Sequence, residues 1–224
     1  YRIYEPFSIF RDVSFNLNQW TQFDFGGNLT APGGNINWFA NFKNYWNTFG
    51  NVNLGGTRLS NSMLRGGPAI KVPGYKRLFL GLSTNQQKKL TFNVRTNHTF
   101  SNEKNFEDSY YYQLTVGYRP FKALRIDMSP GYNNSENELQ YVAQKDFENN
   151  KRYIMGRIER NTLSMSVRLN YNITPDLTIQ YWGQPFIATG KYSDFKYVTN
   201  SKADNAYDRF QYYSGNQISF NEND

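Results

Sequence analysis

Residues 162–174 read TLSMSVRLNYNIT and alternate strictly between polar and apolar side chains. Leu163, Met165, Val167 and the following odd positions are apolar or aromatic, whereas every even position is polar. Only an extended chain repeats its side-chain direction every second residue, so the pattern predicts a β-strand with two chemically opposite faces. The strand is about twice the usual length, and its polar face includes Arg168 in the middle.

The same alternation predicts about eleven strands, several of them joined by tight turns rich in proline and polar residues. They span residues 9–25, 35–47, 49–59, 75–85, 89–100, 109–119, 122–132, 137–144, 151–158, 162–174 and 176–189. Two connections are longer, a loop at 60–74 and a surface loop or tail at 190–224. Long consecutive strands with short turns on one rim are typical of an up-and-down meander, which we expect to include the whole of residues 1–224.

The composition argues against several classes of protein. No apolar run approaches the ~18 residues that a membrane helix needs. The chain has no cysteine and one histidine, which excludes a thiolate metal site and argues against a zinc site. The net charge of +7 comes from Lys and Arg that are scattered along the chain. This distribution does not favour nucleic acid as a partner. It suits an anionic lipid surface, but basic residues that simply keep loops soluble explain it more readily.

Strand length and aromatic positions favour a membrane barrel over a soluble, lectin-like β-protein. A soluble barrel turns its apolar face inward, whereas an outer-membrane barrel turns it to lipid. The predicted strands have the length that a tilted strand needs to cross a bilayer, about 10 residues. From Tyr110 to Tyr118 the rise is roughly 20 Å, near the height of a lipid-facing band between aromatic girdles. We therefore expect an all-β, antiparallel up-and-down transmembrane β-barrel of the outer-membrane type.

Charged residues occupy the polar face of this predicted barrel at mid-strand. The alternation places four charged side chains on that face: Arg95, Arg125, Asp127 and Arg168. An unpaired charge is costly in a narrow lumen, so we expect these four residues to form a buried polar network that closes it.

Two further features are candidates for ligand or lumen contacts. The segment Arg65-Gly66-Gly67-Pro68 is expected either to fold into the lumen as a plug or constriction, or to form an ordered outer loop. Trp20 and Trp182 share the lumen parity and have amide neighbours. This arrangement suits stacking on a sugar as well as filling a narrow lumen.

Catalytic chemistry has little support in the sequence. His98 lies on the apolar parity near a strand end without a companion motif, and we interpret it as an interfacial amphipathic residue. Glu136 and Glu138 share a face, but a chain with 18 acidic residues offers such pairs by chance. The sequence predicts no catalytic residue, no metal and no cofactor.

Several segments resemble a domain of unknown function from Gram-negative outer membranes. They are Arg65-Gly66-Gly67-Pro68, Pro73-Gly74, Glu138-Leu139-Gln140-Tyr141-Val142, Thr162-Leu163-Ser164, Asn170-Tyr171, Thr174-Pro175-Asp176-Leu177, Gln184-Pro185-Phe186 and Gly190-Lys191-Tyr192-Ser193. The resemblance covers most of the chain. It implies a carbohydrate-binding-family-9-like N-terminal domain, which is absent here, followed by a C-terminal β-barrel with further strands beyond Asp224. The ending NQISFNEND departs from the terminal aromatic strand of such barrels, so we expect an incomplete barrel segment.

The sequence and the resemblance together favour a non-enzymatic function. We expect an outer-membrane β-barrel that anchors surface glycan binding or takes part in an outer-membrane complex. A channel for small solutes and an outer-membrane hydrolase are the alternatives. The expected partners are outer-membrane lipid, a glycan ligand and other outer-membrane proteins, with no nucleic acid, and the expected location is the cell outer membrane.

Overall fold

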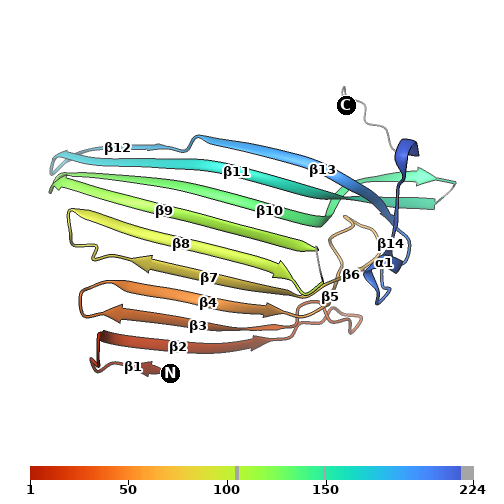
Figure 1. Cartoon of the computed structure of the whole chain (residues 1–224), viewed down its shortest axis with the longest axis horizontal. Coiled ribbons are helices and arrows are strands. Elements are labelled where there is room, and N and C mark those ends of the chain that lie inside the picture. The colour runs from red at the N-terminus through yellow and green to blue at the C-terminus, as the bar shows by residue number, and fades with distance from the viewer. Residues whose placement is uncertain (104–105, 149, 218–224) are drawn as a thin grey trace.

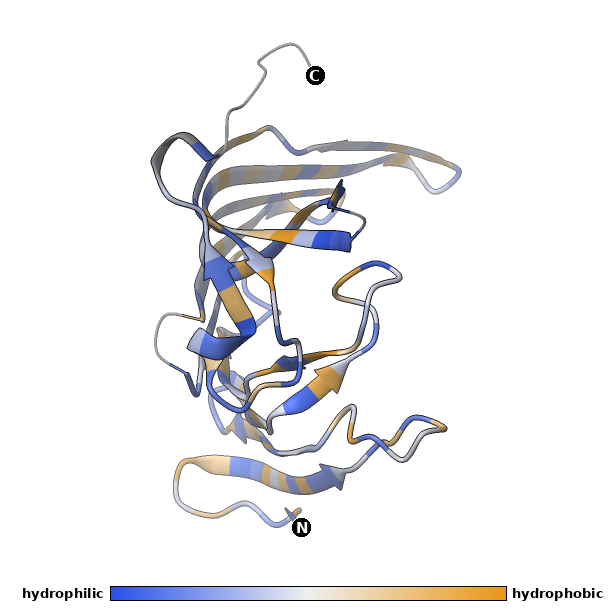
Figure 2. Ribbon diagram, turned by 90° about the vertical axis from the view of Figure 1, so that its right-hand side faces the viewer, coloured by the Kyte–Doolittle hydropathy of each residue, from blue (hydrophilic) through white to orange (hydrophobic). Residues whose placement is uncertain are grey.

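The chain forms an antiparallel β-sheet that curves into an open trough (Figures 1 and 2). The computed structural model describes residues 1–103, 106–148 and 150–217. Its elements are β1 (Arg2–Ile3), β2 (Phe10–Trp20), β3 (Gly33–Phe42), β4 (Asn47–Gly55), β5 (Arg58–Ser60), β6 (Ile70–Val72), β7 (Tyr75–Ser83), β8 (Leu90–Ser101), β9 (Glu107–Phe121), β10 (Leu124–Phe147), β11 (Asn150–Thr174), β12 (Leu177–Gly183), β13 (Phe186–Val198), α1 (Ala206–Arg209), β14 (Phe210–Tyr212) and a short 3₁₀ helix (Gly215–Gln217).

Strands of the large sheet lie side by side in chain order, β1-β2-β3-β4-β7-β8-β9-β10-β11-β13-β14. Each pairs antiparallel with the next, so the prediction of an all-β antiparallel meander is confirmed. Between β4 and β7 the chain leaves the sheet and forms the separate hairpin of β5 and β6. Both β12 and β13 pair with β11, one after the other. Pro185 lies between them and has no N–H for the ladder.

Two strands are much longer than predicted. Residues 122–132 and 137–144 were expected as two strands, but residues 124–147 form the single strand β10. Residues 151–158 and 162–174, also expected as two strands, both belong to β11. The polar residues that suggested breaks stay extended because β10 and β11 pair across them, as Asn133 does with Thr162. A register shift between Asn137 and Gln140 accommodates the irregularity as a β-bulge.

Part of the expected tail is also regular structure. Residues 190–198 complete β13 and pair with β11, and the chain then returns through α1 to β14, which pairs with Lys196–Val198 of β13. The expected loop at 60–74 likewise contains β6. Residues 218–224 of the expected tail lie outside the described residues.

The two ends of the trough differ in their connections. We call one end the short-turn rim; its connections are residues 43–46, 84–89, 122–123 and 175–176. We call the other end the wide rim; its connections include residues 21–32, 56–74 and 199–205. The prediction of short turns on one rim is confirmed by this arrangement.

The main hydrophobic cluster lies near the wide rim. Leu64, Ile70 and Val72 from the β5–β6 excursion pack against Leu139 of β10 and Met155 of β11. All five side chains are buried. The excursion therefore folds onto the concave side of the sheet and fills this end of the trough (Figure 2).

The sheet does not close on itself. In the part of the chain that the structure describes, β1 and β2 form one edge and β12, β13 and β14 form the other, and no pairing joins the two edges. The described residues also include no helix that is both long enough and apolar enough to cross a membrane.

Candidate functional site

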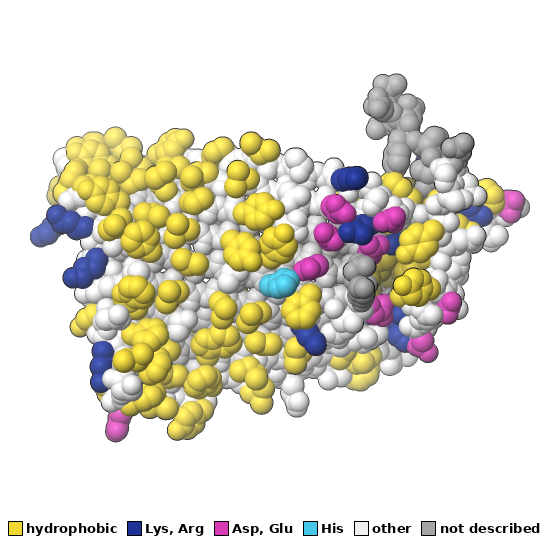
Figure 3. Space-filling model, in the orientation of Figure 1, with side chains coloured by type: hydrophobic (Ala, Val, Ile, Leu, Met, Phe, Trp, Pro, Cys, Tyr) yellow, Lys and Arg dark blue, Asp and Glu magenta, His cyan; other side chains and the backbone are white. Residues whose placement is uncertain are grey.

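A broad apolar band covers the convex face of the sheet (Figure 3). Its central side chains are between 37% and 58% exposed. They are Leu78, Leu80, Leu82, Phe92, Val94, Leu114, Met128 and Leu163. The pairing register aligns them, since Val94 lies opposite both Leu82 and Leu114. Residues between them in sequence point to the concave face, which is largely polar.

Aromatic rings and His98 mark the border of the band toward the wide rim. The ring centroid of Tyr110 lies 6.3 Å from that of His98 and 6.2 Å from that of Tyr132. His98 Nε2 lies 2.8 Å from Asp108 Oδ1. In Figure 3 the single histidine stands where the hydrophobic side chains give way to charged ones. His98 therefore lies at the border between the apolar band and the charged part of the convex face.

Beyond His98 the convex face is charged. The Arg157 guanidinium lies 2.8 Å from a Glu136 oxygen, 3.0 Å from Glu159 and 3.5 Å from Glu138. Asp108 lies opposite Glu136, which lies opposite Glu159, so the carboxylates share one row across β9, β10 and β11. The band therefore ends abruptly, within one residue pair along each of these strands.

Basic side chains mark the border of the band at the short-turn rim. Lys43, Lys88, Lys89 and Lys122 lie in or beside the short turns and are exposed. Figure 3 shows several Lys and Arg side chains along this edge. Aromatic residues also occur here, as the Phe121 and Tyr171 rings meet edge to face at 6.2 Å.

The expected polar network of four charges is only partly present. Arg125 and Asp127 form a two-pronged pair, with Nε 2.8 Å from Oδ2 and one terminal guanidinium nitrogen 2.9 Å from Oδ1. Gly117, opposite Asp127, leaves room for them, because a Cβ there would lie 2.7 Å from Asp127 Oδ1. Arg168 lies opposite Asp127 yet is exposed, and Arg95 is exposed too. Among the described residues, neither joins an ion pair, so Arg125 and Asp127 are the two of the four that are paired.

The segment Arg65-Gly66-Gly67-Pro68 turns toward the trough. Arg65 and Gly66 both have positive φ, 46° and 98°, which tightens the turn. The Arg65 guanidinium lies 4.8 Å from the centre of the Tyr141 ring. Gly67 packs so closely that a Cβ would lie 2.6 Å from the Tyr153 ring. The structure thus places this segment against β10 and β11.

Trp20 and Trp182 do not share a site. Trp20 is half-buried at the end of β2, where Gly33 leaves space for its ring. Trp182 is 57% exposed in β12, opposite Arg168. Because β2 and β12 lie near opposite edges of the sheet, the two rings are not brought together.

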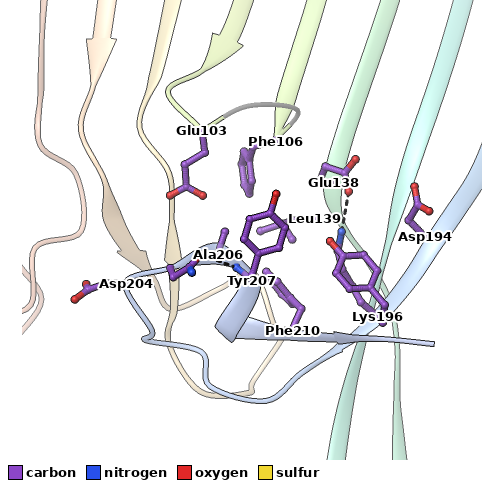
Figure 4. A pocket seen from close by; sticks show the side chains of 12 residues that line it. Glu103, Phe106, Glu138, Leu139, Asp194, Lys196, Asp204, Ala206, Tyr207 and Phe210 are labelled. Atoms are coloured by element: carbon purple, nitrogen blue, oxygen red, sulfur yellow. Dashed lines mark hydrogen bonds and ion pairs between the residues drawn. The ribbon is translucent and has the colours of Figure 1, made fainter. Parts of the chain in front are cut away.

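A pocket that the sequence did not indicate lies at the wide rim (Figure 4). We call it the rim pocket; it has a volume of about 560 Å³, and Glu103, Phe106, Glu138, Lys196, Tyr207 and Phe210 are among its lining residues. Lys196 is 1% exposed, and its Nζ lies 2.8 Å from Glu138 Oε2. The Lys196 Nζ also lies 5.0 Å from the centre of the Tyr212 ring. No local spacing reveals the pocket, because α1 and β13 supply its walls from far along the chain.

Ion pairs fix the outer wall of the rim pocket. The Arg209 guanidinium is 1% exposed and lies 3.4 Å from Glu103 Oε1. Lys71 pairs with Asp204 and thereby holds the pKa of that carboxyl below its usual value. These contacts hold the segment from Asp204 to Arg209 against the β5–β6 excursion.

A family model with the description "Domain of unknown function (DUF5916)" matches residues 1–223. The chain belongs to the DUF5916 family. No curated protein and no solved structure matches it. The match agrees with a family of unknown function, as the resemblance implied, and does not extend to a carbohydrate-binding domain or to a cellular location.

The described residues contain no group of three or more His, Asp or Glu side chains arranged to hold a metal ion. The His98–Asp108 pair is the nearest approach to a catalytic constellation. Its neighbours are the Phe100 and Tyr110 rings, and no serine hydroxyl in the described part of the chain hydrogen-bonds to either member.

Proposed function

We propose that this DUF5916 domain forms part of the wall of a β-barrel in the outer membrane of Gram-negative bacteria. The convex face contacts lipid and the concave face lines the lumen. The observation that carries the proposal is the apolar band, bordered by aromatic residues on both sides and then by charges. This is the order in which a lipid-facing barrel wall meets hydrocarbon, interface and water.

The dimensions of the band support the proposal. Tyr110 and Tyr118 both lie on the convex parity of β9 and are eight residues apart. At a rise of ~3.3 Å per residue and a tilt of ~40°, they are separated by roughly 20 Å along the membrane normal. That height is close to the apolar band of outer-membrane barrels, about 25 Å.

A soluble sheet of this kind has no means of covering the band. Soluble monomers rarely expose continuous apolar patches beyond a few hundred Å². Full burial of a large aliphatic or aromatic side chain contributes about 1.5–3 kcal/mol, and the central side chains of the band, 37% to 58% exposed, leave roughly half of that unrealised in water. The β5–β6 excursion covers the concave side and leaves the convex face open (Figure 2). Lipid is therefore the medium that suits the convex face.

The proposal requires further strands beside those described. In hydrocarbon every backbone N–H and C=O must be paired, so the edges at β2 and at β12–β13 need partners. We infer that additional strands complete the barrel at these two edges. Within the membrane the domain then acts as an anchor, and the wide rim, with its long connections and rim pocket, is the surface for a ligand or partner.

A channel for small solutes is the second candidate function. It is favoured by the concave face, where Asn18, Asn35 and Asn53 form a hydrogen-bonded row across β2, β3 and β4. Conductance in planar bilayers separates a channel from a closed anchor. A hydrolase receives no comparable support from the His98–Asp108 pair.

Adjacent residues of β9 provide the test of the lipid-facing wall. The chain has no cysteine, so Leu114→Cys on the convex face and Thr115→Cys on the concave face can each take a single fluorophore. After reconstitution into vesicles of brominated phosphatidylcholine, the probe at position 114 should be quenched strongly and the probe at 115 weakly. Unbrominated vesicles are the control. Equal quenching at the two positions, or a protein that stays in solution without detergent, contradicts the proposal.

A further inference from the structure

The concave face has a hollow that neither the lipid-facing band nor the rim pocket uses. Its volume is about 550 Å³. Among its lining residues are Asn97, Tyr111, Asn133, Ser164, Gln184 and Phe186. None of the residues that line it is charged. Arg95 and Arg77 lie on the same face of the sheet but are not part of the lining.

The pairing register assembles this hollow from strands far apart in sequence. Asn97 in β8 lies opposite Tyr111 in β9, and Tyr111 lies opposite Asn133 in β10. Side chains on directly opposed residues of neighbouring strands lie on one face, about 5 Å apart. β11 adds Ser164, which lies opposite both Gly131 and Phe186.

Gly131 lies next to two of the residues that line the hollow, Ser164 and Tyr111. A Cβ at this position would lie 3.0 Å from Ser164 Oγ and 3.5 Å from the Tyr111 hydroxyl oxygen. The glycine thus leaves open the space over which these two hydroxyl groups converge.

Two features of the hollow point to a ligand. Asn97 Oδ1 is buried and accepts no hydrogen bond from any residue that the structure describes. An acceptor left in this state costs stability unless something donates to it. Phe186 is 68% exposed on the concave face, so its ring is an accessible apolar platform in the same hollow as that acceptor.

We propose that this hollow binds one unit of a neutral saccharide. Sugar hydroxyl groups donate to Asn97 Oδ1 and exchange hydrogen bonds with the amides of Asn133 and Gln184, which can both donate and accept. The apolar face of the pyranose ring packs on Phe186. Because the lining is uncharged, phosphate or carboxylate ligands gain nothing from it. The proposal goes beyond a membrane anchor and does not depend on insertion into lipid.

The row of paired residues that includes Asn133, Tyr111 and Asn97 continues across the sheet. It offers contacts to neighbouring units of an oligosaccharide. Asn97 lies opposite Phe79 in β7, which lies opposite Asn51 in β4. Asn51 in turn lies opposite Asn37, and Asn37 opposite Asn16. Amides and one aromatic ring therefore extend the same chemistry from the hollow to β2.

The test is a calorimetric titration of the full chain in detergent micelles with maltohexaose, cellohexaose and chitohexaose. At least one should bind, and its affinity should change little between low salt and 0.5 M salt, because no ion pair contributes to binding that salt could screen. Phe186→Ala should weaken binding about tenfold through loss of the ring contact. Ile187→Ala, the next residue and on the opposite face, should leave it unchanged and is the matched control.

A second pair of variants tests the acceptor. Asn97→Leu should weaken binding about tenfold, whereas Asn97→Asp, which keeps an acceptor oxygen, should bind within about twofold of the parent. Parent and variants must show the same circular dichroism. The proposal is overturned if none of the three sugars binds at about 10 mM, or if Phe186→Ala binds as well as Ile187→Ala. It is also overturned if only an acidic oligogalacturonate binds, and that binding disappears in salt.

Discussion

At the scale of single residues, the sequence predicts which face a side chain takes far better than which partner it meets. Strict alternation places Arg125 and Asp127 two residues apart on one face of β10, and the structure shows them paired. Arg95 lies on the same face but on β8, with all of β9 between it and Arg125. Arg168 directly opposes Asp127 and still points into solvent. Parity is a property of the backbone, whereas pairing depends on side-chain reach and on competition from solvent.

The first prediction concerns two adjacent residues of β11. Val167 has convex parity and lies opposite Met128, and Ser166 has concave parity and lies opposite Ser129. If the convex face contacts lipid, Val167→Arg should lower the free energy of unfolding by about 2–4 kcal/mol, because the charge enters hydrocarbon. Ser166→Arg is the matched control and should cost less. Urea unfolding in phospholipid vesicles measures both losses. Equal losses would contradict lipid contact at the convex face, and reversed losses would place lipid at the concave face.

The second prediction concerns the Arg125–Asp127 pair. The side chains are 38% and 16% exposed, so solvent screens much of their attraction. We expect Asp127→Ala to lower the free energy of unfolding by on the order of 1 kcal/mol, and Arg168→Ala, which removes an exposed charge, to have a smaller effect. Denaturant melts of the two variants decide between them. A larger loss for Arg168→Ala would show that Arg168, not Arg125, is the partner of Asp127 in solution.

At the scale of elements, the strands are predicted well and their ends poorly. Alternation identifies the β8 and β9 cores within a few residues, since both faces are chemically distinct there. It fails where Asn133, Asn134 and Ser135 look like a turn but are held extended by β11. The continuation of β13 past Gly190 is missed for a similar reason, because cross-strand pairing with β11 outweighs local propensity.

The third prediction concerns the loop between β2 and β3. The Asp24 carboxylate accepts hydrogen bonds from the backbone N–H groups of Gly26 and Asn28 and from the Asn61 side chain. The Asn28 side-chain amide also donates to this carboxylate and is the largest cause of its lowered pKa. Together the hydrogen bonds lower the pKa of Asp24 from 3.8 to about 2. A lowered carboxyl pKa stabilises the fold above the unfolded value and loses that effect as pH falls through the folded value.

The loop should therefore stay ordered at pH 4 and loosen as the pH falls through about 2. Pepsin works across this range, so cleavage within residues 21–32 should be slow at the upper pH and rapid at the lower one. In Asp24→Ala the loop should be cleaved rapidly at both. Equal cleavage of parent and variant at pH 4 would show that the carboxylate does not order the loop.

At the scale of the whole molecule, the alternation predicts a meander but not its curvature or its long-range contacts. The rim pocket brings together Glu103, Glu138 and Lys196, and Arg209 pairs with Glu103, although no sequence spacing connects these residues. Residues 60–74 were expected only as a long loop. They supply most of the buried cluster, namely Leu64, Ile70 and Val72. Such contacts depend on how the sheet bends, which is a property of all its strands together.

The fourth prediction concerns barrel closure. In the described sheet, β13 pairs with β11 on one side and with β14 only at Lys196–Val198 on the other. If further strands complete the barrel, consecutive backbone amides from 186 to 195 should all exchange slowly with solvent in vesicles. An unpaired edge would leave every second amide of this segment exchanging rapidly. Hydrogen–deuterium exchange read by NMR distinguishes the two patterns, with the central strand β9 as the slow-exchange reference.

The buried cluster at the wide rim gives the two ends of this molecule different thermodynamics. Leu64, Ile70 and Met155 are shielded from water by protein, so their contribution has the heat-capacity signature of an aqueous core and weakens on cooling and in urea. If the convex band contacts lipid as proposed, it gains little from the exclusion of water and responds instead to bilayer thickness. Urea should therefore loosen the wide rim first, whereas a change of acyl-chain length should strain the short-turn half and leave the cluster unaffected.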